Sequence, residues 1–178
     1  MATTDRRHIV LEPPAGTGNA GLWVAALDDT RRRTLEMLDG LDPAWVDAPA
    51  APLQHTIGTL LYHVALIEAD WLYVEIREED YPDDVVALLP WEDRDARGRL
   101  THVTGVTLEA HLERLAAVRE RLRATLLAMG DEKFAAAREI PDATVSTAWV
   151  VNHLMQHEAE HRGEMGQILA TIARSASS

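Results

Sequence analysis

Apolar side chains recur every three or four residues along four stretches of the chain, which is the spacing of one face of a helix. The pattern predicts helices over about 22–38, 56–76 and 107–129, and a last helix that begins at Thr144 or Ser146 and continues to about 172. The second stretch is the clearest, because a hydroxyl residue suited to capping a helix, Thr56, precedes the series Ile57, Leu60, Leu61, Val64, Ile67 and Trp71. We therefore predict an all-α fold, a four-helix bundle with long connections.

One of the predicted connections is unusually long. Residues 77–106 are acidic, contain Pro82 and Pro90, and show no long helical period. We predict a loop there, with one short turn near 83–89. Loops of this length often form lids or pocket walls.

The length of 178 residues suits a single domain with its own core. Pro13-Pro14 and nearby glycines predict a mobile N-terminal lead-in over 1–20. We place the helical domain at 21–174 and a short tail at 175–178.

The charge of the chain excludes several classes of partner. With 17 basic and 29 acidic residues the formal net charge is −12, which argues against nucleic acid and against anionic membranes. The sequence contains no apolar run of about 18 residues and no signal-peptide core at its start, so we expect a cytoplasmic protein.

The chain contains no cysteine. Disulfides, cysteine-containing zinc sites and a protein thiol nucleophile are thereby excluded. Any sulfur chemistry would have to use the thiol of a substrate.

Three histidines lie four residues apart on the last predicted helix: His153, His157 and His161. The rise from the first to the third is ~12 Å, whereas a zinc–nitrogen bond is ~2 Å, so the three cannot share one ion. Helical winding places His161 near the centre of the apolar stripe, His157 on the same face and His153 at its edge. We predict that His157 and His161 form a ligand pair and that a third ligand comes from elsewhere.

The leading third ligand is His63, on the flank of the apolar face of 56–76. His111, on the apolar stripe of 107–129, is its competitor. The alternative for either residue is a hydrogen-bonded histidine of the core. Weaker candidates lie outside the predicted helices: His8, His55 and His102.

Two carboxylates, Glu68 and Glu158, fall on buried faces and therefore need partners. Arg162 could pair with either, or a carboxylate could accept an N–H from a ligating imidazole or transfer a proton. A structural ion pair that holds two helices in register is the favoured interpretation. The run Arg31-Arg32-Arg33 is predicted to form a solvated face.

The segment from Thr56 to Trp71, with the pattern His-x4-Glu-x2-Trp, and the later pattern His-x3-His-Arg-Gly resemble the DinB/YfiT-like superfamily of metal-binding four-helix bundles. The resemblance runs from the first predicted helix to the last. It implies one divalent ion, zinc or nickel in many members, held by His63, His157 and His161. The Arg-Gly-Gln usual in the family reads Arg-Gly-Glu here, at Glu164.

The resemblance extends to thiol-dependent transferases and isomerases that use low-molecular-weight thiols such as bacillithiol or mycothiol. It implies a metal-dependent S-transferase acting on a small molecule, and a homodimer. The alternatives are a hydrolase that uses metal-bound hydroxide and a non-enzymatic metal-binding or stress-response bundle.

Overall fold

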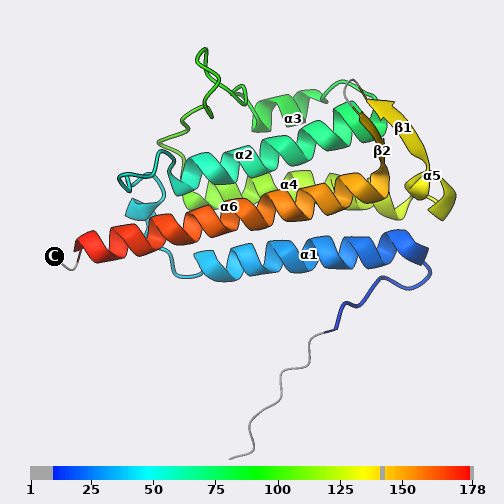
Figure 1. Ribbon diagram of the computed structural model, residues 1–178, viewed down its shortest axis with the longest axis horizontal. Coiled ribbons are helices and arrows are strands. Elements are labelled where there is room, and N and C mark those ends of the chain that lie inside the picture. Colours follow the sequence, from blue (N-terminus) through cyan, green and yellow to red (C-terminus); the bar gives the residue numbers. More distant parts are fainter. Residues whose placement is uncertain (1–9, 141–142, 177–178) are drawn as a thin grey trace, which may run out of the picture.

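The structure, a computed structural model, describes residues 10–140 and 143–176 and is mostly helical (Figure 1). His8 and the first nine residues of the predicted lead-in lie outside the described residues. The elements in chain order are α1 (Gly18–Leu38), the 3-10 turn η1 (Pro43–Trp45), α2 (Ile57–Asp70), the π-helical segment η2 (Trp71–Arg77), α3 (Asp83–Leu88), α4 (Leu108–Leu127), α5 (Asp131–Ala135), β1 (Ala137–Ile140), β2 (Ala143–Ser146) and α6 (Thr147–Ala176).

The four longest helices of the described part, α1, α2, α4 and α6, lie side by side (Figure 1). α2 packs against α4 and α6, and α1 packs against the same two helices. Their apolar stripes meet in one core whose most buried members include Leu27, Leu61, Leu122, Met165 and Ile168. Burying one such side chain stabilises the fold by about 1.5–3 kcal/mol. The mostly helical fold is confirmed, while α3 and α5 raise the described α-helices to six.

The directions of the long helices explain the long connection. α1 and α6 run one way and α2 and α4 run the other way (Figure 1). Because α2 and α4 are parallel and follow each other among the long helices, the chain must return along the bundle between them. Residues 78–107 make this return, and α3 is the short helical turn expected near 83–89.

Several boundaries differ from the predicted ones. α1 begins at Gly18, so the last residues of the predicted lead-in are helical. The cap predicted at Thr56 is present, since its hydroxyl oxygen accepts a hydrogen bond from the Thr59 N–H at 3.2 Å. α6 continues to Ala176, into the predicted tail, and residues 177–178 lie outside the described part.

The described part agrees with the predicted all-α class, and it adds one short β-hairpin before α6. β1 and β2 pair antiparallel, with Ala137 opposite Ser146, and they cover the end of the bundle next to α5 (Figure 1). Each strand has four residues, so the alternation is too short to stand out from the sequence. Although α6 spans 30 residues, no helix of the described part is long and apolar enough to cross a membrane.

Candidate metal centre

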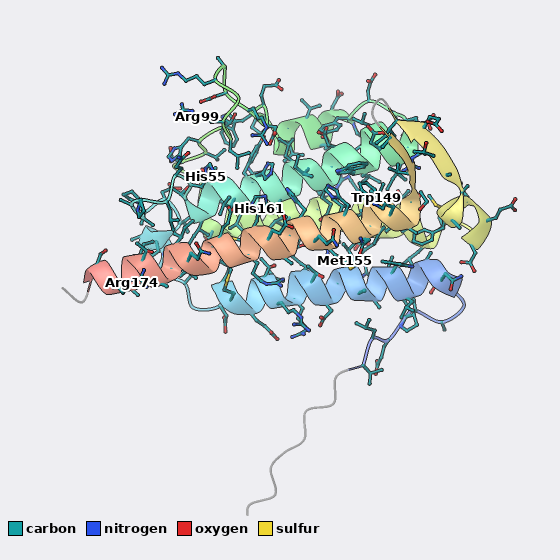
Figure 2. All side chains as sticks on the ribbon, in the orientation of Figure 1. His55, Arg99, Trp149, Met155, His161 and Arg174 are labelled. Carbon is teal, nitrogen blue, oxygen red and sulfur yellow. The ribbon has the colours of Figure 1, made fainter. Side chains whose placement is uncertain are left out.

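Three imidazole rings meet between α2 and α6. The Nε2 atom of His157 lies 3.0 Å from Nε2 of His63 and 3.1 Å from Nε2 of His161. Figure 2 shows His161 on the side of α6 that faces α2. The three residues form a group whose candidate ligand nitrogens all lie within 4.8 Å of one another. They could therefore hold a metal ion.

The fold brings these rings together for a simple reason. His157 and His161 are one helical turn apart on α6, so their rings lie next to each other and meet edge to face, with centroids 4.5 Å apart. α2 crosses beside α6 and presents His63, whose ring centroid is 4.9 Å from both of the others. Two helices far apart in the sequence thus supply three nitrogens to one point.

The outer nitrogen atoms of two rings face carboxylates. Nδ1 of His63 lies 2.6 Å from Oδ1 of Asp93, and Nδ1 of His161 lies 3.2 Å from Oε2 of Glu164. A carboxylate accepts hydrogen bonds, so each Nδ1 carries the proton and each Nε2 is left with a lone pair. Both lone pairs point to Nε2 of His157.

A single N–H on His157 cannot donate to both of these lone pairs along a good line. A cation at the meeting point satisfies all three. Nitrogens ~2.1 Å from a tetrahedral zinc lie roughly 3.4 Å apart, close to the two spacings of 3.0 and 3.1 Å from His157. Carboxylates behind ligating imidazoles are also the usual support of such sites. The donor set therefore fits a divalent metal ion.

Burial keeps two rings of the cluster, His157 and His63, uncharged near neutral pH. It lowers the pKa of His157 to about 3, with help from the neighbouring His161 and His63. Burial also lowers the pKa of His63, and the nearby Asp93 carboxylate offsets only part of this effect. Neutral imidazoles have the free lone pairs that metal ligation requires.

His153 stays outside the cluster, at the edge of the predicted stripe. Its ring stacks on Trp149, with an interplanar angle of 1° and centroids 5.2 Å apart, and meets Trp71 edge to face. Its centroid is 6.2 Å from that of His157. The ring thus belongs to an aromatic cluster beside the three histidines.

The competing histidines lie elsewhere. His111 is fully buried, and its Nδ1 accepts a hydrogen bond from Arg114 at 3.2 Å, so it is a core residue. His55 and His102 line a separate hollow together with Asp95 and Arg99. None of the three joins the described cluster.

The two buried carboxylates pair with residues that the sequence analysis did not assign to them. Glu68 accepts hydrogen bonds from Arg119 Nε at 2.7 Å and from Arg31 Nη2 at 3.0 Å. Glu158 accepts from Arg31 Nε and from the Thr34 hydroxyl, both at 2.8 Å. Arg119 Nη2 reaches both carboxylates.

Two predictions about arginines are thereby corrected. Arg162 is not the partner of Glu68 or Glu158, since its guanidinium donates to the Thr30 carbonyl at 3.2 Å. Arg31 is not solvated but 7% exposed, while Arg32 and Arg33 are exposed as predicted. Three consecutive residues point in three directions around a helix, so one member of a charged run can face inward.

The buried ion-pair cluster, formed by Arg31, Glu68, Arg119 and Glu158, stabilises the packing of the helices. Two guanidinium groups balance two carboxylates, and the four side chains tie α1, α2, α4 and α6 together. Burial would raise the pKa of Glu158, but Arg31 and Arg119 outweigh it and hold that pKa below its usual value. Glu158 is therefore an ionised structural group, which agrees with the favoured interpretation of these carboxylates.

Asp93 was not predicted as a site residue from the sequence. It lies in the long connection among many acidic residues, and nothing in the local pattern distinguishes it. The contact of Glu164 with His161 was not predicted either, since the sequence showed Glu164 only as a departure from the family pattern. The contact of each with a cluster histidine depends on how distant segments pack.

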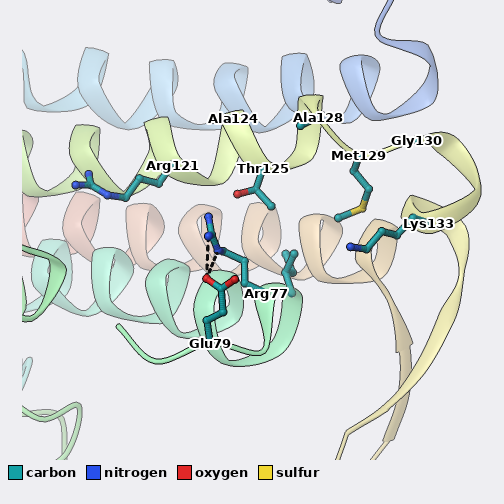
Figure 3. Close-up of a pocket in the computed structure, with 10 residues that line it drawn as sticks. Arg77, Glu79, Arg121, Ala124, Thr125, Ala128, Met129, Gly130 and Lys133 are labelled. Atoms are coloured by element: carbon teal, nitrogen blue, oxygen red, sulfur yellow. Dashed lines mark hydrogen bonds and ion pairs between the residues drawn. The ribbon is translucent and has the colours of Figure 1, made fainter. Parts of the chain in front are cut away.

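A cleft of about 560 Å³ lies apart from the histidines, between η2, α4 and α5 (Figure 3). Arg77, Arg121 and Lys133 stand around it, and Arg77 is paired with Glu79. No histidine lines it, so it is not part of the three-histidine site.

The protein is thus a helical one with three convergent imidazoles that could hold a metal ion between two helices. Residues 26–165 match the sequence profile of the DinB superfamily. Because the match covers most of the chain, the protein belongs to the DinB superfamily.

No curated protein matches the chain in sequence. The fold is similar to the crystal structure of a conserved protein from Enterococcus faecalis, with a TM-score of 0.68 and 17% identity over 87% of this chain and 98% of that one. At this identity the likeness supports the fold alone.

Proposed function

We propose that His63, His157 and His161 hold one divalent cation, zinc or nickel, and that the protein is a metal-dependent enzyme of the thiol S-transferase type. The observation that carries the metal proposal is the convergence of three Nε2 atoms, two of them on rings held by carboxylates from behind. Family membership supports the same ligand set.

Each residue has a distinct task in this proposal. The three histidines supply neutral ligands and leave further coordination positions for a small molecule. Asp93 and Glu164 fix two rings with their lone pairs inward. A bound divalent ion supplies one kind of chemistry, because it lowers the pKa of a coordinated thiol or water.

The thiol in the proposed reaction belongs to a cosubstrate, since the chain contains no cysteine. The thiol sulfur forms a bond to an electrophilic carbon, and a leaving group departs with the bonding electron pair. The thiol proton passes to solvent water. The thiol itself is proposed from the family resemblance.

Three further proposals concern the architecture, the oligomeric state and the compartment of the protein. The four long helices form the family's four-helix bundle, the protein acts as a homodimer, and its compartment is the cytoplasm. The first two rest on the resemblance, and the third is the expectation stated from the sequence.

The test of the reaction is turnover by the full chain loaded with zinc or nickel. Bacillithiol, mycothiol and glutathione are each supplied with an aryl halide, and the conjugate is measured by absorbance. We expect conjugation with at least one thiol, lost on chelation and restored by metal. Metal-dependent ester hydrolysis without thiol would replace the proposal with a hydrolase, and chelation that only lowers Tm would indicate a structural ion.

A further inference from the structure

The Asp93 carboxylate that supports His63 comes from a segment without regular structure. Its side chain is 27% exposed, so burial alone does not fix it. We propose that Tyr62 is a positioning residue, which clamps the connection at Trp91 and thereby holds Asp93 against Nδ1 of His63. The inference rests on the proposed metal site.

The phenol of Tyr62 makes both of its hydrogen bonds to one residue. Its oxygen donates to the Trp91 carbonyl at 2.6 Å and accepts from the Trp91 N–H at 2.8 Å. Tyr62 is 2% exposed, and its ring meets the Trp91 ring edge to face at 5.2 Å. The backbone two residues before Asp93 is therefore fixed in position and direction.

Arg114 of α4 holds the same junction from the other side. Its Nε donates to the Leu88 carbonyl at 2.6 Å, at the carboxyl end of α3, where a cation is favourable. Its guanidinium carbon lies 5.2 Å from the centre of the Tyr62 ring and 6.0 Å from that of Trp91. Tyr62 is thus held in its rotamer by packing that does not need the hydroxyl.

The connection is also anchored after Asp93. The Thr59 hydroxyl accepts from the Val103 N–H at 3.2 Å and lies 3.4 Å from the Val103 carbonyl. Thr59 is one helical turn before His63 on α2. α2 therefore forms hydrogen bonds with the connection both before and after Asp93, the residue that orients His63.

Loss of the Tyr62 hydroxyl should act on His63 through Asp93. Tyr62→Phe keeps the ring, its contact with Trp91 and its contact with Arg114, but frees the Trp91 peptide. Without a fixed carboxylate, the His63 proton can move to Nε2, the atom that faces the other imidazoles. That tautomer cannot ligate a metal through Nε2, the atom that faces the other two rings.

The closest control is Tyr81→Phe. The Tyr81 hydroxyl donates to Oδ1 of Asp70 at 2.9 Å, so it also ties the long connection to α2, but near the start of the connection and away from Asp93 in its middle. Both variants remove one phenolic oxygen and keep the ring. A difference between the two variants in the His63 tautomer or in the Kd would show that the effect depends on where the hydroxyl anchors the connection.

The experiment has two readouts on the full chain. The tautomer of His63 is read from its ¹⁵N chemical shifts in the metal-free protein, and the Kd for Zn²⁺ or Ni²⁺ is measured by competition with a chelating dye. We expect Tyr62→Phe to populate the Nε2–H tautomer and to weaken metal binding roughly 10-fold, as is typical for loss of a group behind a ligand. Tyr81→Phe should match the wild type in both.

The inference is overturned if Tyr62→Phe keeps the wild-type tautomer, or if its Kd equals that of Tyr81→Phe. A wild-type protein that binds neither metal would contradict the proposed metal site, and the tautomer would still decide the role of Tyr62. Asp93→Asn serves as a second variant, because it keeps the shape of the side chain and removes the charge that orients His63. It should shift the tautomer at least as far as Tyr62→Phe.

Discussion

Glu158 directly follows His157 on α6, yet its carboxylate serves a different purpose. One residue along a helix is a rotation of about 100°, so His157 faces α2 while Glu158 faces the centre of the bundle. Its 1% exposure and its bonds to Arg31, Thr34 and Arg119 make it part of the buried ion-pair cluster. Adjacent residues thus lie in two different clusters, His157 among the three histidines and Glu158 among the buried ion pairs.

Glu158→Gln should therefore destabilise the protein without removing the metal site. The substitution keeps the shape of the side chain but leaves Arg31 and Arg119 with one carboxylate between them. We expect the free energy of unfolding to fall by about 3 kcal/mol. Chemical denaturation measures this change. Glu160→Gln, an exposed position on the same helix, is the control and should change stability by less than about 0.5 kcal/mol.

A Glu158→Gln protein with wild-type stability would mean that the cluster does not need both charges. Loss of metal binding in a folded Glu158→Gln protein would assign Glu158 to the metal centre instead.

At the scale of the elements, α6 was the most predictable part of the molecule. Its winding separates His153 from His157 and His161, and the structure places His153 with Trp149 and the other two with His63. In a long amphipathic helix, the position of a residue in the sequence determines the direction in which its side chain points around the helix axis. Prediction of the meeting with α2 also needed the family resemblance.

The connection between α2 and α4 was the least predictable part. Its short helix α3 could be anticipated from spacing, whereas the contact between Asp93 and His63 could not. An irregular segment has no period, so sequence does not tell which of its many carboxylates turns inward. Arg31 shows that prediction can also fail on a regular helix. Its charge predicted an exposed side chain, but the side chain is buried because it pairs with Glu68 and Glu158.

At the scale of the whole molecule, buried neutral histidines make the metal-free fold sensitive to acid. The pKa of His157 is about 3 and that of His111 about 4 in the folded chain, both lowered chiefly by burial. Unfolded histidines titrate near 6.5. Below that pH the unfolded chain binds more protons than the folded one, so stability is lost as pH falls from about 6.5 towards 4.

We therefore expect the Tm of the metal-free protein to fall steadily from pH 7 to pH 4.5. Thermal melts monitored by circular dichroism at 222 nm measure this. His111→Gln removes one of the two groups and should flatten the dependence. A Tm that is constant or rises over this range would contradict the account of the buried histidines.

The most direct test of the metal centre is the number of metal ions bound per chain, measured by mass spectrometry after loading with Zn²⁺ or Ni²⁺ and dialysis. The account predicts one ion per chain for the wild type and for His153→Ala. It predicts less than about 0.1 ion for His63→Ala, His157→Ala and His161→Ala, since two remaining ligands bind weakly. A full equivalent retained by any of these three, or lost from His153→Ala, would contradict it.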